Sequence, residues 1–346
     1  MKMSSSVPAA AVAVMVLLSA VSTTTVTGQA LVPGVMIFGD SVVDAGNNNR
    51  LATLVRADFP PYGRDFPATH APTGRFCNGK LATDYTVESL GLSSYPPAYL
   101  SEEAQSNKSL LHGANFASGA AGYLDATAAL YGAISLSRQA EYFREYQSRV
   151  AASAGERRAR KLTSGSIYVV SAGTSDYVQN YYVNPMLSAA YTPDQFADAL
   201  MPPFTSFVEC VADHRTIVSL PIKMNAQGLY SLGARRIGVM SLPPMGCLPA
   251  SVALFGGGNA GCVERLNNDS LTFNRKLGAA ADAVKRRHSD LKLVVFDVYQ
   301  PLLDLGAPGT CTNATGYVFW DGFHPTDAAN KVLADAQLLQ GLQLIA

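Results

Sequence analysis

The stretch Val35-Met-Ile-Phe-Gly-Asp-Ser41 places four consecutive apolar residues directly before a glycine, an aspartate and a serine. A short apolar run that ends at turn-forming residues predicts a strand buried on both faces, as in a parallel sheet. Ser41 follows this strand, where a tight turn would expose its hydroxyl above the sheet. The stretch therefore predicts a central strand and, at its carboxyl end, a candidate nucleophile.

Similar runs recur outward along the chain and alternate with helical patterns. Runs that predict strands cover residues 110–116, 166–171, 236–241 and 291–297, and apolar residues at helical spacing cover 134–150, 263–288 and 326–340. Another helix is expected to begin at Asp194, with Asp194 as its N-cap. This alternation predicts an α/β fold with helices on both faces of a parallel sheet. Because no linker or change of composition divides residues 31–346, we expect a single domain there.

Residues that follow the predicted strands are candidate site residues, because ligands bind beyond the carboxyl ends of parallel strands. They are Ser41, Gly119, Ser175 and the proline-rich loop 243–249. These positions are dispersed in sequence, and the predicted sheet would bring them to one edge.

A second group of candidates lies near the C-terminus, in Trp320-Asp-Gly-Phe-His-Pro325. A serine becomes a nucleophile only beside a base, usually a histidine that a third group orients. Asp321 and His324 are close enough in sequence for the carboxylate to accept a hydrogen bond from the imidazole, which leaves the other ring nitrogen to face Ser41. Gly-Asp-Ser alone is often a turn, and Asp-x-x-His alone is often a helix cap. Their joint presence favours a triad of Ser41, Asp321 and His324.

Two other patterns are interpreted as structural. Residues 74–80 nearly match the phosphate-binding loop G-x-x-x-x-G-K-[ST], but Leu81 replaces the required hydroxyl and a proline-rich loop precedes the segment. Asp40, Asp44 and Asp176 would suit a carboxylate metal site, but buried carboxylates that cap turns explain them more simply. With no C-x-x-C and no His/Cys cluster, we expect no metal.

Composition excludes several classes of protein. The 346 residues include 26 Lys and Arg against 26 Asp and Glu, and 48% are hydrophobic while 15% are charged. The balanced charge gives no electrostatic argument for nucleic acid or for an anionic membrane surface as a partner. High hydrophobicity with low charge excludes a disordered chain, and the lack of a repeat excludes collagen and solenoids.

The first 30 residues predict a signal peptide. Lys2 supplies a basic start, an apolar run follows over residues 7–21, and Gly28-Gln29-Ala30 suits cleavage after Ala30. The run is too short to span a bilayer comfortably, and an N-terminal membrane anchor is the alternative. We therefore expect a mature chain that begins at Leu31 and is exported, with no transmembrane segment.

Two further features agree with export. Glycosylation sequons begin at Asn107, Asn268 and Asn313. The five cysteines are Cys77, Cys210, Cys247, Cys262 and Cys311. In an oxidising compartment some of them should pair, and the odd number leaves at least one without an intramolecular partner.

Seven segments together resemble the secreted plant-type GDSL esterase/lipase family of the SGNH hydrolase superfamily. They are residues 38–49 (FGDSVVDAGNNN), 74–80 (GRFCNGK), 115–122 (NFASGAAG), 173–176 (GTSD), 233–239 (GARRIGV), 242–249 (LPPMGCLP) and 319–325 (FWDGFHP). The resemblance implies a flavodoxin-like α/β/α sandwich, with Ser41 as nucleophile, His324 as base and Asp321 as the orienting carboxylate. It also implies an oxyanion hole from the Ser41 and Gly119 amides and an asparagine side chain. Neither a metal nor an organic cofactor is implied.

The family implies hydrolysis of lipid, small-molecule or polymer esters outside the cell, in the apoplast or cell wall. An acyltransferase, in which an alcohol replaces water as the acceptor, is a variant of this hypothesis.

Three departures from the family support a competing hypothesis, a catalytically impaired secreted protein. Ser175 stands where the family has the oxyanion asparagine, and its shorter side chain is a poorer donor. Residues 210–227 form an unusual insertion, which is either a retained intron or a gene-model error, or else a genuine surface insertion. The segment before Thr310 is shortened, which would leave Cys311 without its usual partner.

Overall fold

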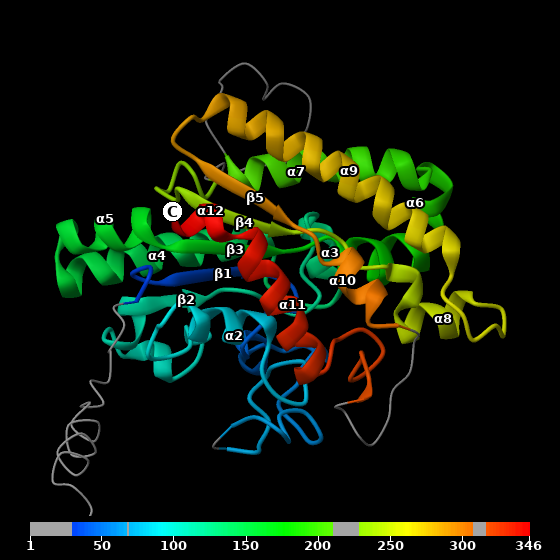
Figure 1. Cartoon of the computed structure of the whole chain (residues 1–346), viewed down its shortest axis with the longest axis horizontal. Coiled ribbons are helices and arrows are strands. Elements are labelled where there is room, and N and C mark those ends of the chain that lie inside the picture. The colour runs from blue at the N-terminus through cyan, green and yellow to red at the C-terminus, as the bar shows by residue number, and fades with distance from the viewer. Residues whose placement is uncertain (1–29, 68, 210–227, 307–315) are drawn as a thin grey trace, which may run out of the picture. The chain divides into compact units, whose positions relative to one another are not determined.

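The computed structural model describes residues 30–67, 69–209, 228–306 and 316–346 (Figure 1). Several features of the sequence lie outside the described residues. They are the insertion 210–227, which includes Cys210, then Cys311 and Asn313, and all but the last residue of the expected signal peptide. From Leu31 onward the described chain forms one compact unit.

Five parallel strands form the central sheet. They are β1 (Val35–Gly39), β2 (Gly113–Asn115), β3 (Ile167–Ser171), β4 (Arg236–Met240) and β5 (Lys292–Phe296). Their order is β2-β1-β3-β4-β5, and every adjacent pair is parallel. This is the flavodoxin-like order, so the predicted fold class is confirmed.

The helices flank this sheet. They are α2 (Ala82–Ser89), α3 (Asp125–Leu130), α4 (Leu136–Ala154), α5 (Glu156–Gly165), α6 (Pro185–Ala190), α7 (Pro193–Val208), α8 (Pro249–Phe255), α9 (Glu264–Arg287), α10 (Tyr299–Asp304), α11 (Asp327–Gln340) and α12 (Leu342–Ile345). Short 3₁₀ turns are η1 (Asn47–Arg50), η2 (Glu103–Gln105), η3 (Ser109–His112), η5 (Tyr181–Val183) and η6 (Met245–Cys247), and η4 (Asp176–Asn180) is a π-helical turn.

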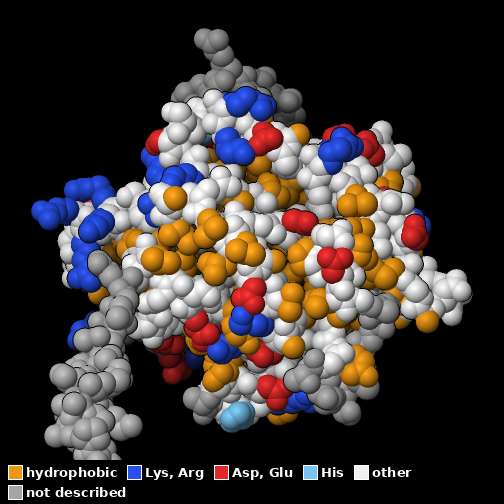
Figure 2. Space-filling model, in the orientation of Figure 1, with side chains coloured by type: hydrophobic (Ala, Val, Ile, Leu, Met, Phe, Trp, Pro, Cys, Tyr) orange, Lys and Arg blue, Asp and Glu red, His pale blue; other side chains and the backbone are white. Residues whose placement is uncertain are grey.

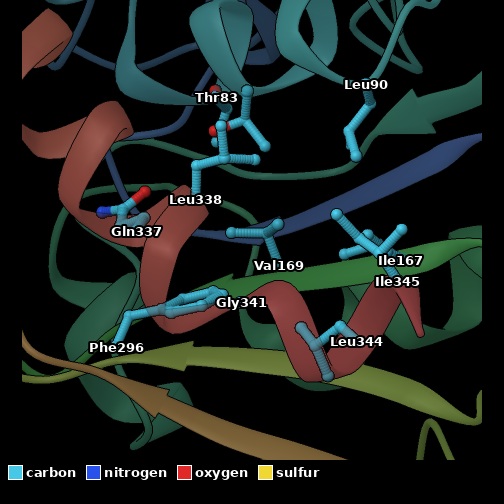
Figure 3. A pocket seen from close by; sticks show the side chains of 11 residues that line it. Thr83, Leu90, Ile167, Val169, Phe296, Gln337, Leu338, Gly341, Leu344 and Ile345 are labelled. Carbon is cyan, nitrogen blue, oxygen red and sulfur yellow. The ribbon is translucent and has the colours of Figure 1, made fainter. Parts of the chain in front are cut away.

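The side chains of each strand alternate between the two faces of the sheet, and helices cover both faces, so the fold has three layers. Tyr168 of β3 points to one face, where its ring packs against Phe38 of β1 and Phe143 of α4. Its neighbours Ile167 and Val169 point to the other face, toward α2, α11 and α12 (Figure 3). Because successive strand residues face opposite sides, both faces of the sheet need apolar cover, and the two sets of helices supply it.

The observed bounds of one helix and one strand differ from the expected bounds. Helix α7 begins at Pro193 and not at Asp194, because Thr192 is the N-cap and forms a capping box with Gln195. Of the run 110–116, only Gly113–Asn115 is a strand, since η3 occupies the residues before it.

Basic side chains gather at one end of the viewed face (Figure 2). Figure 2 shows Lys and Arg side chains gathered at α5, where Arg157, Arg158, Arg160 and Lys161 are exposed. Within the described ranges, no helix combines the length and apolarity needed to cross a membrane.

Candidate active site

Ser41 lies in the turn after β1, where the backbone admits few alternatives. Gly39 has a φ of +130°, and a Cβ there would lie 1.9 Å from the carbonyl oxygen of Ser171 on β3. The Asp40 amide donates to that same oxygen at 2.9 Å. The buried Gln139 side chain accepts from the Gly39 N–H at 2.8 Å and donates to the Gly39 carbonyl at 2.9 Å. These contacts fix the serine at the carboxyl edge of the sheet.

The structure brings Ser41, His324 and Asp321 together, although the serine and the histidine are 283 positions apart. Nε2 of His324 lies 2.7 Å from Oγ of Ser41, and Nδ1 lies 2.8 and 2.7 Å from the two carboxylate oxygens of Asp321. Because an ionised carboxylate only accepts hydrogen bonds, this arrangement assigns the proton to Nδ1 and leaves Nε2 as the acceptor facing the hydroxyl. A serine hydroxyl, an imidazole and a carboxylate are thus in continuous contact.

The carboxylate of Asp321 is held by several donors. Its Oδ1 accepts the amides of Phe323 at 2.8 Å and His324 at 2.9 Å, and its Oδ2 accepts the Tyr62 hydroxyl at 2.9 Å. Burial alone would raise the pKa of Asp321, but the charge and hydrogen bond of His324, together with the two amides, lower the pKa to about 2. Asp321 is therefore ionised at physiological pH.

The three expected oxyanion donors differ in availability. The Ser41 amide has no acceptor among the described residues. The Gly119 amide donates to Oδ2 of Asp44 at 3.0 Å, so this N–H is occupied. Ser175 is buried directly before η4, and its hydroxyl has no hydrogen-bond partner in the described part of the chain. Two of the three expected donors thus have no acceptor among the described residues.

Three buried aspartates around the site each cap a turn. Asp40 accepts hydrogen bonds from the Val42 amide and the Ser171 hydroxyl. Asp44 accepts from the amides of Gly46, Asn47 and Gly119. Asp176 accepts from the amides of Tyr123 and Leu124 and from the Thr127 hydroxyl. Burial raises the pKa of Asp40 to about 7 and the pKa values of Asp44 and Asp176 to about 6. Among the described residues, no three His, Cys, Asp or Glu side chains are grouped to hold a metal.

A small, mainly apolar pocket adjoins the loops of the site. Four residues of its lining directly neighbour candidate site residues in sequence. Val42 follows Ser41, Thr174 precedes Ser175, and Phe323 and Pro325 flank His324. Much of the remaining lining is apolar and includes Met240, Leu248, Val298, Leu302, Phe319 and Leu333. Such a lining suits a hydrocarbon chain.

The segment that resembles a phosphate-binding loop docks on α11. Asp327, the first residue of α11, accepts the Lys80 amide at 2.6 Å, and the Asp327 amide donates to Oδ1 of Asn78 at 2.8 Å. Gly79 lies between them, where a Cβ would be 2.6 Å from Oδ1 of Asp327. Because α11 begins just after His324, this docking supports the loop that carries the histidine.

Sequence reasoning missed Gln139 and Tyr62, which support the nucleophile turn and the carboxylate. Gln139 lies among helical residues of α4, and Tyr62 lies in a proline-rich loop. The signal for Gln139 was a polar residue on the buried face of a predicted helix. For Tyr62 there was no local signal, because its partner is 259 positions away.

The cysteines and sequons are only partly described. Cys247 and Cys262 form a disulfide, and Cys77 is a buried free thiol. Asn107 is exposed in a turn, whereas Asn268 is exposed on α9.

Comparisons with known proteins identify the family of this chain. The family model described as GDSL-like lipase/acylhydrolase matches residues 35–336. A GDSL esterase/lipase of Arabidopsis thaliana is 51% identical over 350 residues, covering 92% of this chain and 91% of the relative. The A. thaliana GDSL esterase/lipase APG is 49% identical over 360 residues, covering 95% of this chain and 96% of the relative. A solved α/β hydrolase from the metagenome of Lake Arreo, Spain, has a TM-score of 0.39 at 11% identity and covers 91% of this chain and 99% of its own.

Proposed function

Because this chain belongs to the family of GDSL-like lipases and acylhydrolases, we propose that it hydrolyses carboxylic esters through Ser41, His324 and Asp321. The observation that carries the assignment is the continuous contact from the Ser41 hydroxyl through the His324 imidazole to the Asp321 carboxylate. The ionised carboxylate of Asp321 accepts a hydrogen bond from Nδ1 of His324, which leaves Nε2 to accept the Ser41 proton.

The first half of the reaction forms an acyl-enzyme. Oγ of Ser41 attacks the ester carbonyl carbon while Nε2 of His324 takes the hydroxyl proton. The carbonyl oxygen becomes an oxyanion, for which the Ser41 amide and the Ser175 hydroxyl are the proposed donors. The tetrahedral intermediate then collapses, the alcohol leaves with the proton from His324, and the acyl group remains on Ser41.

The second half repeats this sequence with water. His324 removes a proton from the water, which attacks the acyl carbonyl, and the carboxylic acid leaves as Oγ of Ser41 regains a proton. If an alcohol reaches the acyl-enzyme instead of water, the same steps transfer the acyl group to it. Gly119 joins the oxyanion hole only if its amide leaves Asp44.

We further propose that the apolar pocket at Val42 and Phe323 receives the acyl part of the ester. This pocket and the family favour small-molecule or lipid esters, with esters of an extracellular polymer as a third group.

We also propose export of residues 31–346 as a single domain after removal of residues 1–30. Exposed Asn107 is a better-placed glycosylation site than Asn268, because Asn268 lies within a helix, and Asn313 is the third candidate. Mass spectrometry of the secreted protein would read the N-terminal residue and the modified asparagines directly.

Ester hydrolysis by the full chain, expressed in a secretory host, tests the assignment. The substrates are p-nitrophenyl esters of increasing chain length, and the variant is Ser41→Ala. Losing the nucleophile should lower kcat by about a thousandfold or more. Ser188→Ala, on the exposed helix α6, is the matched control and should retain parental kcat.

Equal turnover by a folded parent and by Ser41→Ala would contradict the triad. Ser175→Asn then tests the oxyanion donor, since a longer side chain that donates to the oxyanion should raise kcat by about tenfold or more. Ser175→Ala should lower kcat.

A further inference from the structure

Tyr62 makes a direct contact with the carboxylate of the triad from a distant part of the chain. Its hydroxyl donates to Oδ2 of Asp321 at 2.9 Å. Oδ1 of the same carboxylate has three other donors nearby, the amides of Phe323 and His324 and the imidazole. Oδ2 receives only the imidazole and Tyr62 among the described residues. Tyr62 therefore supplies the second donor to the oxygen that would otherwise be held by His324 alone.

The tyrosine keeps its proton and so remains a donor. Tyr62 is half-buried, and burial together with the negative charge and hydrogen bond of Asp321 raises the pKa of its hydroxyl far above the ordinary value. An O–H group beside an ionised carboxylate forms a charge-assisted hydrogen bond, which is stronger than a bond between neutral groups.

The ring of Tyr62 is itself held in place. It packs edge-on against Phe76, with ring centroids 6.0 Å apart, and Phe76 lies 5.0 Å from the imidazole of His324. Phe76 is buried. The loop between η1 and α2 thus contacts both members of the Asp–His pair, one through a hydroxyl and the other through a ring face.

We propose that Tyr62 is a positioning residue that fixes the rotation of the Asp321 carboxylate and thereby the direction of the His324 imidazole. This inference rests on the proposed triad. With the hydroxyl present, both oxygens of Asp321 are held and Nε2 points at Ser41. Without it, Oδ2 can exchange its partner for water and the carboxylate can rotate, so the imidazole spends less time in line with the serine hydroxyl.

The chain provides a matched control for the loss of one tyrosine hydroxyl. Tyr85 donates to Oδ2 of Asp327 at 3.0 Å and is also partly buried. This second Tyr–Asp bond also links the N-terminal part of the chain to the segment after Phe319, but it touches no triad residue. Without the Tyr85 hydroxyl, Oδ1 of Asp327 still accepts the Lys80 amide and the Asp327 amide still donates to Asn78, so the start of α11 stays docked. Tyr62→Phe and Tyr85→Phe therefore remove the same chemical group at comparable structural cost.

The decisive experiment compares steady-state hydrolysis of p-nitrophenyl butyrate by the full-length parent, Tyr62→Phe, Tyr85→Phe and Ser41→Ala. Tyr62→Phe should lower kcat about tenfold and leave KM within about twofold, because the lost bond acts on the reacting geometry and not on substrate binding. Tyr85→Phe should keep parental kcat. The proton of His324 Nδ1, observed by NMR at low field, should shift or broaden in Tyr62→Phe only.

A double-mutant cycle with Asp321→Asn separates a positioning role from a loss of folding. If Tyr62 acts through Asp321, adding Tyr62→Phe to Asp321→Asn should change kcat by less than about twofold. The inference is overturned if Tyr62→Phe matches Tyr85→Phe in kcat and in the NMR signal, or if its effect persists undiminished in Asp321→Asn. Parental activity in Ser41→Ala would instead overturn the proposed function itself.

Discussion

At the scale of single residues, the buried aspartates differ in how many of their oxygens are occupied. Asp40 accepts hydrogen bonds with Oδ1 alone, from the Val42 amide and the Ser171 hydroxyl. Asp44 and Asp176 accept with both oxygens. An asparagine side chain keeps one acceptor oxygen and has an NH₂ donor in place of the other oxygen. At Asp44 and Asp176 this NH₂ group would oppose an existing donor. Of the three aspartates, only Asp40 can therefore be replaced by asparagine without such a conflict.

The Asp40→Asn variant should therefore change how stability depends on pH. The pKa of Asp40 is about 7 in the fold and 3.8 in the unfolded chain, so the folded state binds the proton more tightly. The contribution of protonated Asp40 to the stability of the fold is fully present below pH 4 and is lost as the pH rises to about 7. In Asp40→Asn this loss is absent, so the melting temperature should fall less between pH 4 and pH 7 than in the parent.

Thermal unfolding followed by circular dichroism at several pH values measures this difference. Asp44→Asn is the comparison, and it should destabilise the protein at every pH because its amide group would oppose the Gly119 N–H. Parallel curves for the parent and Asp40→Asn would show that ionisation of Asp40 does not set the pH dependence.

Single residues also show how far sequence reasoning reaches into the site. Ser41 could be proposed because it follows a strand, and Asp321 and His324 because their spacing lets them meet. The contacts of Tyr62 and Gln139 could not be predicted this way, since they join segments that are distant in sequence. The occupied Gly119 amide has the same cause, because its acceptor Asp44 lies on another loop.

At the scale of elements, the segment 74–80 acts as a support for α11. The lack of a side chain at Gly79 lets Asp327 approach the backbone there, and the Lys80 amide and Asn78 side chain then bind the start of the helix. We expect the conformation of the His324 loop to depend on this contact, because the loop ends where α11 begins.

A Gly79→Ala substitution tests that dependence. The added methyl would lie 2.6 Å from Oδ1 of Asp327, so the helix start must move. We expect a fall of about 1–3 kcal/mol in the free energy of unfolding and a loss of kcat on p-nitrophenyl esters. Gly278→Ala is the control, because no atom lies within 4 Å of a Cβ at Gly278 and alanine favours the interior of helix α9. An unchanged kcat in Gly79→Ala would show that the histidine loop is held independently.

Elements were predictable where their apolar pattern was clear. The strands at β1, β3, β4 and β5 and the helices α4, α9 and α11 match the expected segments closely, because each buries an apolar stripe. Helix α2 was not predicted, since its buried face carries Thr83 and Asp84, and Asp84 is buried only because it pairs with Arg75. The start of α7 could have been found, since Thr192 and Gln195 form a capping box visible in sequence.

At the scale of the whole molecule, the residues on either side of 210–227 are adjacent in space. The Leu229 amide donates to the carbonyl of Phe207 and the Tyr230 amide to the carbonyl of Val208, both at 2.9 Å. If residues 210–227 were absent, each of these bonds would join a residue to the fourth one before it, which is the α-helical pattern. The flanking chain is thus in register for α7 to continue directly into residues 228–230.

Deleting residues 210–227 should therefore leave the fold and the activity intact. Joining Glu209 to Gly228 removes the entropy cost of closing a loop of 18 residues, about 2–3 kcal/mol, so the melting temperature should rise. Calorimetry and kcat of the deletion variant measure the two effects. A deletion variant that fails to fold would show that the segment contributes contacts that the protein needs.

The distance in sequence between the nucleophile and its base has a consequence for how activity arises. Ser41 directly follows β1, the first strand of the described sheet, whereas Asp321 and His324 lie in the last described segment, 283 positions later for the histidine. During synthesis the serine is present for almost the whole elongation time without a base to activate it. Under the proposed triad, the enzyme is therefore inert until Asp321 and His324 have been added, and we expect a chain that stops short of Asp321 to have no hydrolytic activity.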